Sequence, residues 1–276
     1  MPIPLEDLYN DVISKSMRGL GLSEADVAAE AGVNVEAVTA AKAGSADDAI
    51  LLKIAPVLQL DGPALVTMAH AAWAPLDIQL EGLAQFNTSY HDMTVNAYLV
   101  WDKETKNAVA FDTGADATPM IEFIEKNGLN LSLIFLTHTH GDHIQDLAKL
   151  SADGAVTTFV NEAEPCSGAG VKTFKLGDTE SWETGSLRIE PRSTCGHSKG
   201  GITYVVHGLP QPVAIVGDAL FASSMGGGMV SHADALATNR KEIFTLPDAT
   251  ILCPGHGPLT TVGEEKEHNP FYPEFK

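Results

Sequence analysis

The run THTHGDH at residues 137–143 constrains this chain more than any other segment. It follows directly on the apolar residues LIFL, which predict a β-strand. Because alternate residues of an extended segment point to the same side, His138 and His140 can converge on one ion. Asp142 and His143 follow where the chain turns into a helix, offset toward a second ion. Such a cluster at a strand end indicates a metal site rather than a group of solvated surface histidines.

Three further His or Asp residues end apolar runs beside glycine in the second half of the chain. They are His197 in CGHS, Asp218 in VGDA and His256 in CPGHGP. Each alone is typical of a turn, but four such motifs in one domain form a strong pattern. A neighbouring glycine lets the backbone approach a crowded metal centre without a Cβ. Imidazole and carboxylate ligands suit zinc, iron or manganese, and three side chains per ion leave one position open for water.

The pattern of elements divides the chain into two parts. Residues 1–72 predict short helices only, whereas β-rich runs alternate with helices from residue 78 onward. We therefore expect a small all-α module at 1–72 and a layered α/β domain at 73–276. Predicted helices include 35–43, 47–59, 62–72, 118–127 and 232–244, and predicted strands cover 98–101, 108–111, 133–136, 157–160, 187–190, 202–206, 213–216 and 250–252.

The N-terminal module has the order helix, glycine-containing turn, helix. Ser23 starts the second helix in a capping-box position with Asp26, and Gly32 begins the turn before the third. This order resembles the repressor-type helix-turn-helix family. The would-be recognition helix offers almost nothing to contact bases or phosphates, and the module carries four Lys and Arg residues against ten Asp and Glu. We interpret it as a packing or dimerisation module, with sequence-specific DNA binding as the alternative.

Composition excludes several classes of protein. The 276 residues are 44% hydrophobic, which suffices for a full core, and the formal net charge of −19 argues against binding RNA or another polyanion. No uninterrupted apolar stretch is long enough for a transmembrane helix. The start lacks the basic and apolar regions of a secretory signal, and the three cysteines are sparse and odd in number. We expect a soluble cytoplasmic protein with reduced thiols.

Residues from about 78 to 276 resemble the metallo-β-lactamase-fold hydrolases, on the HxHxDH motif and the three later motifs. The resemblance implies a four-layer αβ/βα sandwich and seven side chains that hold two divalent ions. These are His138, His140 and His197 for the first ion, Asp142, His143 and His256 for the second, and Asp218 as the bridge. Asp112 in FDTG matches the early Asp-x-Gly of the family and implies a residue that orients a ligand. We expect zinc, with iron or manganese as alternatives, and assign catalytic roles to Asp142, His143 and Asp218.

The C-terminal run from Cys253 to Phe271 resembles the small type II glyoxalases, or hydroxyacylglutathione hydrolases. This resemblance implies a small thioester substrate such as S-lactoylglutathione, attacked at its carbonyl by a hydroxide that two metal ions generate. A thiolate leaves at neutral pH without a strong general acid. Lys199 is the candidate contact for an anionic substrate group. The short segment 161–172, the uncharged run 223–228 and the single histidine at 197 depart from common members of the family and leave the substrate open.

Other functions remain as alternatives to thioester hydrolysis. A persulfide dioxygenase shares the motifs but uses one iron bound by two histidines and an aspartate. A lactonase or a β-lactamase is less favoured because of the C-terminal resemblance. A regulator that binds DNA and senses a ligand with its hydrolase-like domain is the alternative from another class. The apolar faces of the N-terminal helices also make a homodimer plausible.

Overall fold

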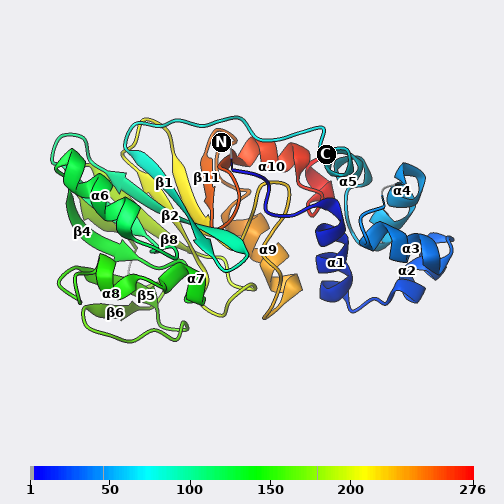
Figure 1. Ribbon diagram of the computed structural model, residues 1–276, viewed down its shortest axis with the longest axis horizontal. Coiled ribbons are helices and arrows are strands. Elements are labelled where there is room, and N and C mark those ends of the chain that lie inside the picture. The colour runs from blue at the N-terminus through cyan, green and yellow to red at the C-terminus, as the bar shows by residue number, and fades with distance from the viewer. Residues whose placement is uncertain (1–2, 46, 179) are drawn as a thin grey trace.

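The chain folds into two six-stranded sheets with helices on their outer faces and a group of five helices at one end (Figure 1). The structure, a computed structural model, describes residues 3–45, 47–178 and 180–276. The strand order is β1-β2-β3-β4-β5-β6 in one sheet and β12-β11-β10-β9-β8-β7 in the other. This arrangement confirms the expected α/β sandwich with helices before the first strand.

The elements follow one another in three groups along the chain. The N-terminal helices are α1 (Tyr9–Leu20), α2 (Glu24–Ala31), α3 (Val35–Lys42), α4 (Asp48–Val57) and α5 (Gly62–Ala69). The first half of the sandwich consists of β1 (Leu83–Tyr90), β2 (Met93–Trp101), β3 (Asn107–Phe111), α6 (Thr118–Asn127), β4 (Asn130–Phe135), α7 (Gly141–Ile144), α8 (Leu147–Leu150), β5 (Thr157–Asn161) and β6 (Val171–Phe174). The second half consists of β7 (Trp182–Thr184), β8 (Leu187–Ser193), β9 (Ile202–His207), β10 (Val213–Gly217), α9 (His232–Glu242), β11 (Ile251–Pro254), β12 (Thr260–Thr261), α10 (Val262–His268) and the short 3-10 helix η1 (Pro273–Phe275).

The predicted elements are present, with different ends in several cases. Helix α6 matches its prediction at both ends. Helices α4 and α5 are shorter than predicted, because Gln59 and Ala71 take positive φ angles of 55° and 48° that end the helical path. The sequence patterns do not predict strands β1, β6, β7 and β12 or helices α8, α10 and η1. The sequence of β1, LAQFNTSY, is polar and partly exposed, so it lacks the apolar run of a buried strand.

Alternation along the strands buries both faces of each sheet. In β10, Val213 and Ile215 face the core between the two sheets, whereas Ala214 and Val216 face the helices outside. The same alternation occurs in β3, where Val109 points inward. No helix among the described residues is long and apolar enough to cross a membrane.

The five N-terminal helices share one hydrophobic core with the outer face of the second sheet. Side chains from α1, including Ile13 and Met17, belong to the same buried cluster as Val216 of β10 and Phe271 near the C-terminus. Figure 1 shows α1 beside α9, and the two helices are in contact. The predicted capping box of α2 is confirmed: Ser23 accepts a hydrogen bond from the backbone N–H of Asp26.

A buried glutamate, Glu265 of α10, stabilises the loop that follows β10. Its carboxylate accepts hydrogen bonds from the backbone N–H of Ser223 at 3.0 Å, the hydroxyl of Thr260 at 2.8 Å and the amide of Asn269 at 2.8 Å. Burial raises the pKa of Glu265 to about 8, although these three hydrogen bonds act to lower it. The carboxyl group therefore takes up a proton more readily in the folded chain than in the unfolded one.

We expect the free energy of unfolding to fall as pH rises between about 4.5 and about 8 because of Glu265. The folded-state pKa lies above the unfolded one, so this contribution is complete at low pH and is lost as pH passes the folded-state value. Denaturant unfolding of wild type, Glu265→Gln and the exposed control Glu267→Gln across this range measures it. Equal slopes against pH for wild type and Glu265→Gln would contradict the assignment.

Candidate metal centre

The seven predicted metal ligands lie together at the carboxyl ends of four strands. His138 and His140 follow β4, and Asp142 and His143 lie in the short helix α7 that comes next. The other three follow strands of the second sheet, His197 after β8, Asp218 after β10 and His256 after β11. The two sheets therefore bring His and Asp side chains from segments more than a hundred residues apart in sequence to one edge of the sandwich.

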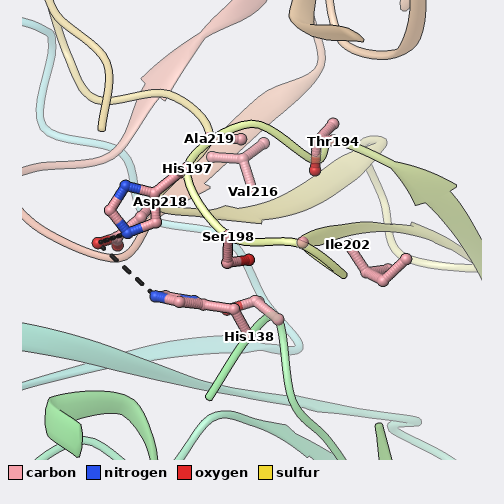
Figure 2. Close-up of a pocket in the computed structure, with 10 residues that line it drawn as sticks. His138, Thr194, His197, Ser198, Ile202, Val216, Asp218 and Ala219 are labelled. Carbon is pink, nitrogen blue, oxygen red and sulfur yellow. Dashed lines mark hydrogen bonds and ion pairs between the residues drawn. The ribbon is translucent and has the colours of Figure 1, made fainter. Parts of the chain in front are cut away.

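The first group of donor atoms surrounds His140. Its Nδ1 lies 3.0 Å from Nε2 of His138 and 3.0 Å from Nε2 of His197. Oδ2 of Asp218 lies 3.4 Å from Nε2 of His197 and 3.9 Å from Nε2 of His138 (Figure 2). Each of these four residues offers a donor atom within 4.8 Å of the others, a spacing that a single cation can bridge.

The second group consists of Asp142, His143 and His256. Oδ2 of Asp142 lies 3.2 Å from Nε2 of His256 and 3.6 Å from Nε2 of His143. Asp218 faces this group too, with its Oδ1 3.2 Å from Nε2 of His143 and its Oδ2 3.5 Å from Nε2 of His256. Asp218 therefore stands between both groups.

Two observations show that these residues fit divalent cations. Nε2 of His143 and Oδ1 of Asp218 are buried, and within the described part of the chain neither has a hydrogen-bond partner. Buried polar atoms without partners are rare in proteins and call for an ion or another ligand. A Cβ on Gly255 would lie 2.1 Å from Oδ1 of Asp218, so only glycine leaves this space open. Nitrogen and carboxylate donors of this kind hold zinc, iron or manganese.

Hydrogen bonds to the outer ring nitrogens fix four of the imidazoles. Nδ1 of His143 donates to Asp112 at 2.8 Å, and Nδ1 of His138 donates to the hydroxyl of Thr137 at 3.1 Å. The remaining two donate to backbone carbonyls, His197 to Gly227 at 2.9 Å and His256 to Thr94 at 2.6 Å. These bonds hold a proton on each outer Nδ1, so Nε2 is the ring nitrogen that binds a metal ion once its own proton is lost.

Asp112 is buried and links the two histidine groups. Besides His143, its carboxylate accepts hydrogen bonds from the backbone N–H and the hydroxyl of Thr137, both at 2.7 Å. Its backbone has a φ of 56°, a strained conformation for a residue other than glycine. This position agrees with the orienting role that the sequence resemblance implies.

The electrostatic field of the centre is dominated by the buried carboxylate of Asp218. Burial raises the pKa of that carboxyl, but His143 and His256 outweigh burial and hold it well below its usual range. Burial lowers the pKa of His143, yet Asp218 and Asp112 raise it to about 10. Burial also lowers the pKa of His256, yet Asp218 and Asp142 raise it to about 11. The carboxylates therefore attract positive charge to this point, which favours cations.

Several residues that support the centre were not found from the sequence. Glu164 accepts hydrogen bonds from Thr139 at 3.0 Å and from the backbone of Gly200 at 2.6 Å, and so joins the loops that carry the first-group histidines. Asn96 of β2 donates to the carbonyls of Pro254 and Gly257, which flank His256. Their partners lie far away in sequence, so no local motif marks them.

A cavity of about 10 Å³ lies beside the first group, lined by His138, His197, Ser198 and Asp218 among others (Figure 2). It has room for about one water molecule, so it is too small for a substrate. His140 is exposed, whereas His138 is buried. The side of His140 is therefore the side on which the centre is open to solvent. Lys199 is also exposed, and no hydrogen bond or ion pair joins its side chain to the described residues.

Comparison with known proteins places the chain in a family. The sequence model of the Metallo-beta-lactamase superfamily matches residues 92–256, and the chain belongs to that superfamily. Hydroxyacylglutathione hydrolase GloC of Haemophilus influenzae is 29% identical over 197 residues, which cover 64% of this chain and 92% of that protein. Both matches leave a large part of the chain unmatched, and the superfamily match begins after the N-terminal helices.

Solved structures agree with this assignment. The BLEG-1 B3 metallo-beta-lactamase has a TM-score of 0.60 and 29% identity, over 69% of this chain and 99% of that one. ETHE1 from Myxococcus xanthus has a TM-score of 0.58 and 25% identity, over 69% of this chain and 85% of that one. The fold and the His and Asp groups together imply divalent metal ions in this chain.

We expect Asp112→Asn to weaken metal binding by about 10- to 100-fold, because an amide presents a donor where His143 and Thr137 need an acceptor. Competition with a chromogenic chelator measures the affinity. Asp116→Asn is the matched control, since the bonds of this exposed aspartate within the described ranges go to Thr118 and Lys149. Equal affinities in the two variants would show that Asp112 does not orient the ligands.

Proposed function

We propose that this chain is a dinuclear metallohydrolase that cleaves thioesters of the hydroxyacylglutathione type. The observation that carries the proposal is the position of Asp218 between two groups of donor atoms, with His138, His140 and His197 on one side. The similarity to GloC extends over 92% of that hydrolase and supports the thioester as substrate.

The side chains of the centre would hold the metal ions next to the carbonyl group of the thioester substrate. Two divalent ions, when bound, supply hydroxide near neutral pH and stabilise negative charge that develops on the substrate oxygen. Asp142 and His143 would hold the second ion, and Asp218 would contact both ions. We assign catalytic roles to these three residues. Asp112 accepts the proton of Nδ1 of His143, so Nε2 is the ring nitrogen that would bind the metal. The thiolate product leaves without a protonating side chain because thiols ionise near neutral pH.

We propose zinc as the metal, because histidine and carboxylate ligands with one open position are typical of catalytic zinc sites. The same ligands also hold iron or manganese, so the metal content decides among them. One iron per chain would fit the persulfide dioxygenase alternative instead.

We propose that helices α1–α5 form a packing module of the hydrolase rather than a DNA-binding domain. Lys42, the cation of the would-be recognition helix, pairs with Glu24 at 2.7 Å. The buried faces of these helices contribute to the core shared with the second sheet. The module therefore stabilises the hydrolase and lies beside its metal centre.

We expect the purified protein to bind about two metal ions per chain and to hydrolyse S-lactoylglutathione. His140→Ala removes the nitrogen nearest to both His138 and His197, so it should lower first-site occupancy and reduce hydrolysis by at least about 100-fold. Elemental analysis and a thiol-release assay measure the two effects.

His70→Ala is the matched control, because His70 is an exposed histidine at the end of α5 that pairs with Asp48. Its metal content and activity should equal those of wild type. One iron per chain with oxygen uptake and no thiol release would overturn thioester hydrolysis. Full activity in His140→Ala would show that the first group is not the catalytic centre.

A further inference from the structure

Helix α1 is held against the loop that follows the bridging residue Asp218. Nζ of Lys15 donates to the carbonyl of Met225 at 2.8 Å and pairs with the buried carboxylate of Asp7. The hydroxyl of Ser224 donates to the same carboxylate at 2.5 Å. The ammonium of Lys15 also lies 5.0 Å above the ring of Phe221. The N-terminal helices therefore have a fixed position beside the metal centre.

One turn further along α1, Arg18 reaches the edge of this centre. A Cβ on Gly227 would lie 3.0 Å from Nη2 of Arg18, and the carbonyl of Gly227 accepts the hydrogen bond from His197. Only one residue therefore separates the guanidinium group from a metal-ligand candidate. Arg18 also contributes, after burial, to lowering the pKa of His232, which shows that its charge acts at this place.

Arg18 is exposed and, within the described ranges, forms no ion pair with a carboxylate. The formal charge of the chain is −19, so a free guanidinium beside the centre contrasts with its surroundings. Two other cations nearby, Lys15 and Lys42, are paired with Asp7 and Glu24. Arginine binds carboxylates and phosphates through two parallel hydrogen bonds, which makes an anionic group its natural ligand.

A cavity of about 590 Å³ opens between α1, α2 and the end of α3, and Arg18 lines it together with Met17, Leu22 and Lys42. Small-molecule sites commonly have volumes of about 300–1,000 Å³ and mix apolar walls with a few polar groups. This cavity has both features, Glu24 and its partner Lys42 also line it, and Arg18 is the lining residue that lies beside Gly227.

We propose that the thiol-bearing half of the substrate lies in this cavity along α1, with an anionic group of the thiol carrier bound to Arg18. The proposal rests on the thioester hydrolysis proposed above and adds the place where the thiol carrier binds and the residue that holds its anionic group. The anionic group is a carboxylate in glutathione and a phosphate in coenzyme A.

The test uses three lactoyl thioesters, of glutathione, of coenzyme A and of the uncharged thiol N-acetylcysteamine. Arg18→Ala should raise KM for a charged thioester by about tenfold, the value of one hydrogen bond to a charged group, and leave KM for the uncharged thioester unchanged. Arg18→Lys should restore part of the loss. Calorimetric titration with S-methylglutathione and with coenzyme A, neither of which is hydrolysed, gives the same comparison without turnover.

Lys53→Ala, at an exposed lysine of α4, is the control and should change none of these values. An effect confined to the glutathione compounds identifies a carboxylate as the anion, and one confined to coenzyme A identifies a phosphate. Unchanged KM and binding for both in Arg18→Ala would overturn the inference while hydrolysis by wild type still supports the proposed function. No hydrolysis of any of the three by the metal-loaded wild type would overturn both.

Discussion

The carboxylate of Asp218 is the group on which the rest of the structure depends. A buried carboxylate is stable only where positive charge or hydrogen bonds compensate for lost hydration. Here Oδ1 faces His143 of the second group, Oδ2 faces histidines of both groups, and Oδ1 has no hydrogen-bond partner in the described chain. The histidines that compensate this charge are the same residues that, with Asp218, would bind two cations. Stability and metal binding are therefore coupled at this residue.

The two sheets supply the geometry that this interaction needs. The ligands follow β4 in one sheet and β8, β10 and β11 in the other, so neither sheet alone forms the centre. Each ligand lies shortly after the end of a strand or in the short helix α7, which sets its place in the fold. Gly255 shows how little space remains, because a Cβ there would reach Oδ1 of Asp218. The strained backbone of Asp112 is tolerated because three hydrogen bonds hold its carboxylate in place.

Local sequence patterns predict the strands and ligands whose positions depend on neighbouring residues. They do not predict contacts between segments that are distant in sequence. The alternation of β3 and β10 and the spacing of His138 and His140 could be predicted, because each reflects the period of an extended strand. The support of His256 by Asn96 could not, since the two are joined only when β2 and β11 meet in the fold. Strand β1 escaped prediction because its partner β2, not its own polar sequence, keeps it in the sheet.

The N-terminal helices show how one local pattern can serve two different functions. Their capping residues and glycine turns resemble a DNA-binding module, but these features only specify short helices and the angles between them. DNA binding and packing against the hydrolase differ in what the faces of these helices contact. Ile13 and Met17 belong to a core that includes residues of the hydrolase, and Lys15 bonds to the loop after Asp218. Helix α3, the would-be recognition helix, belongs to the same core through Val38 and Ala41, so the helices pack as one body with the hydrolase.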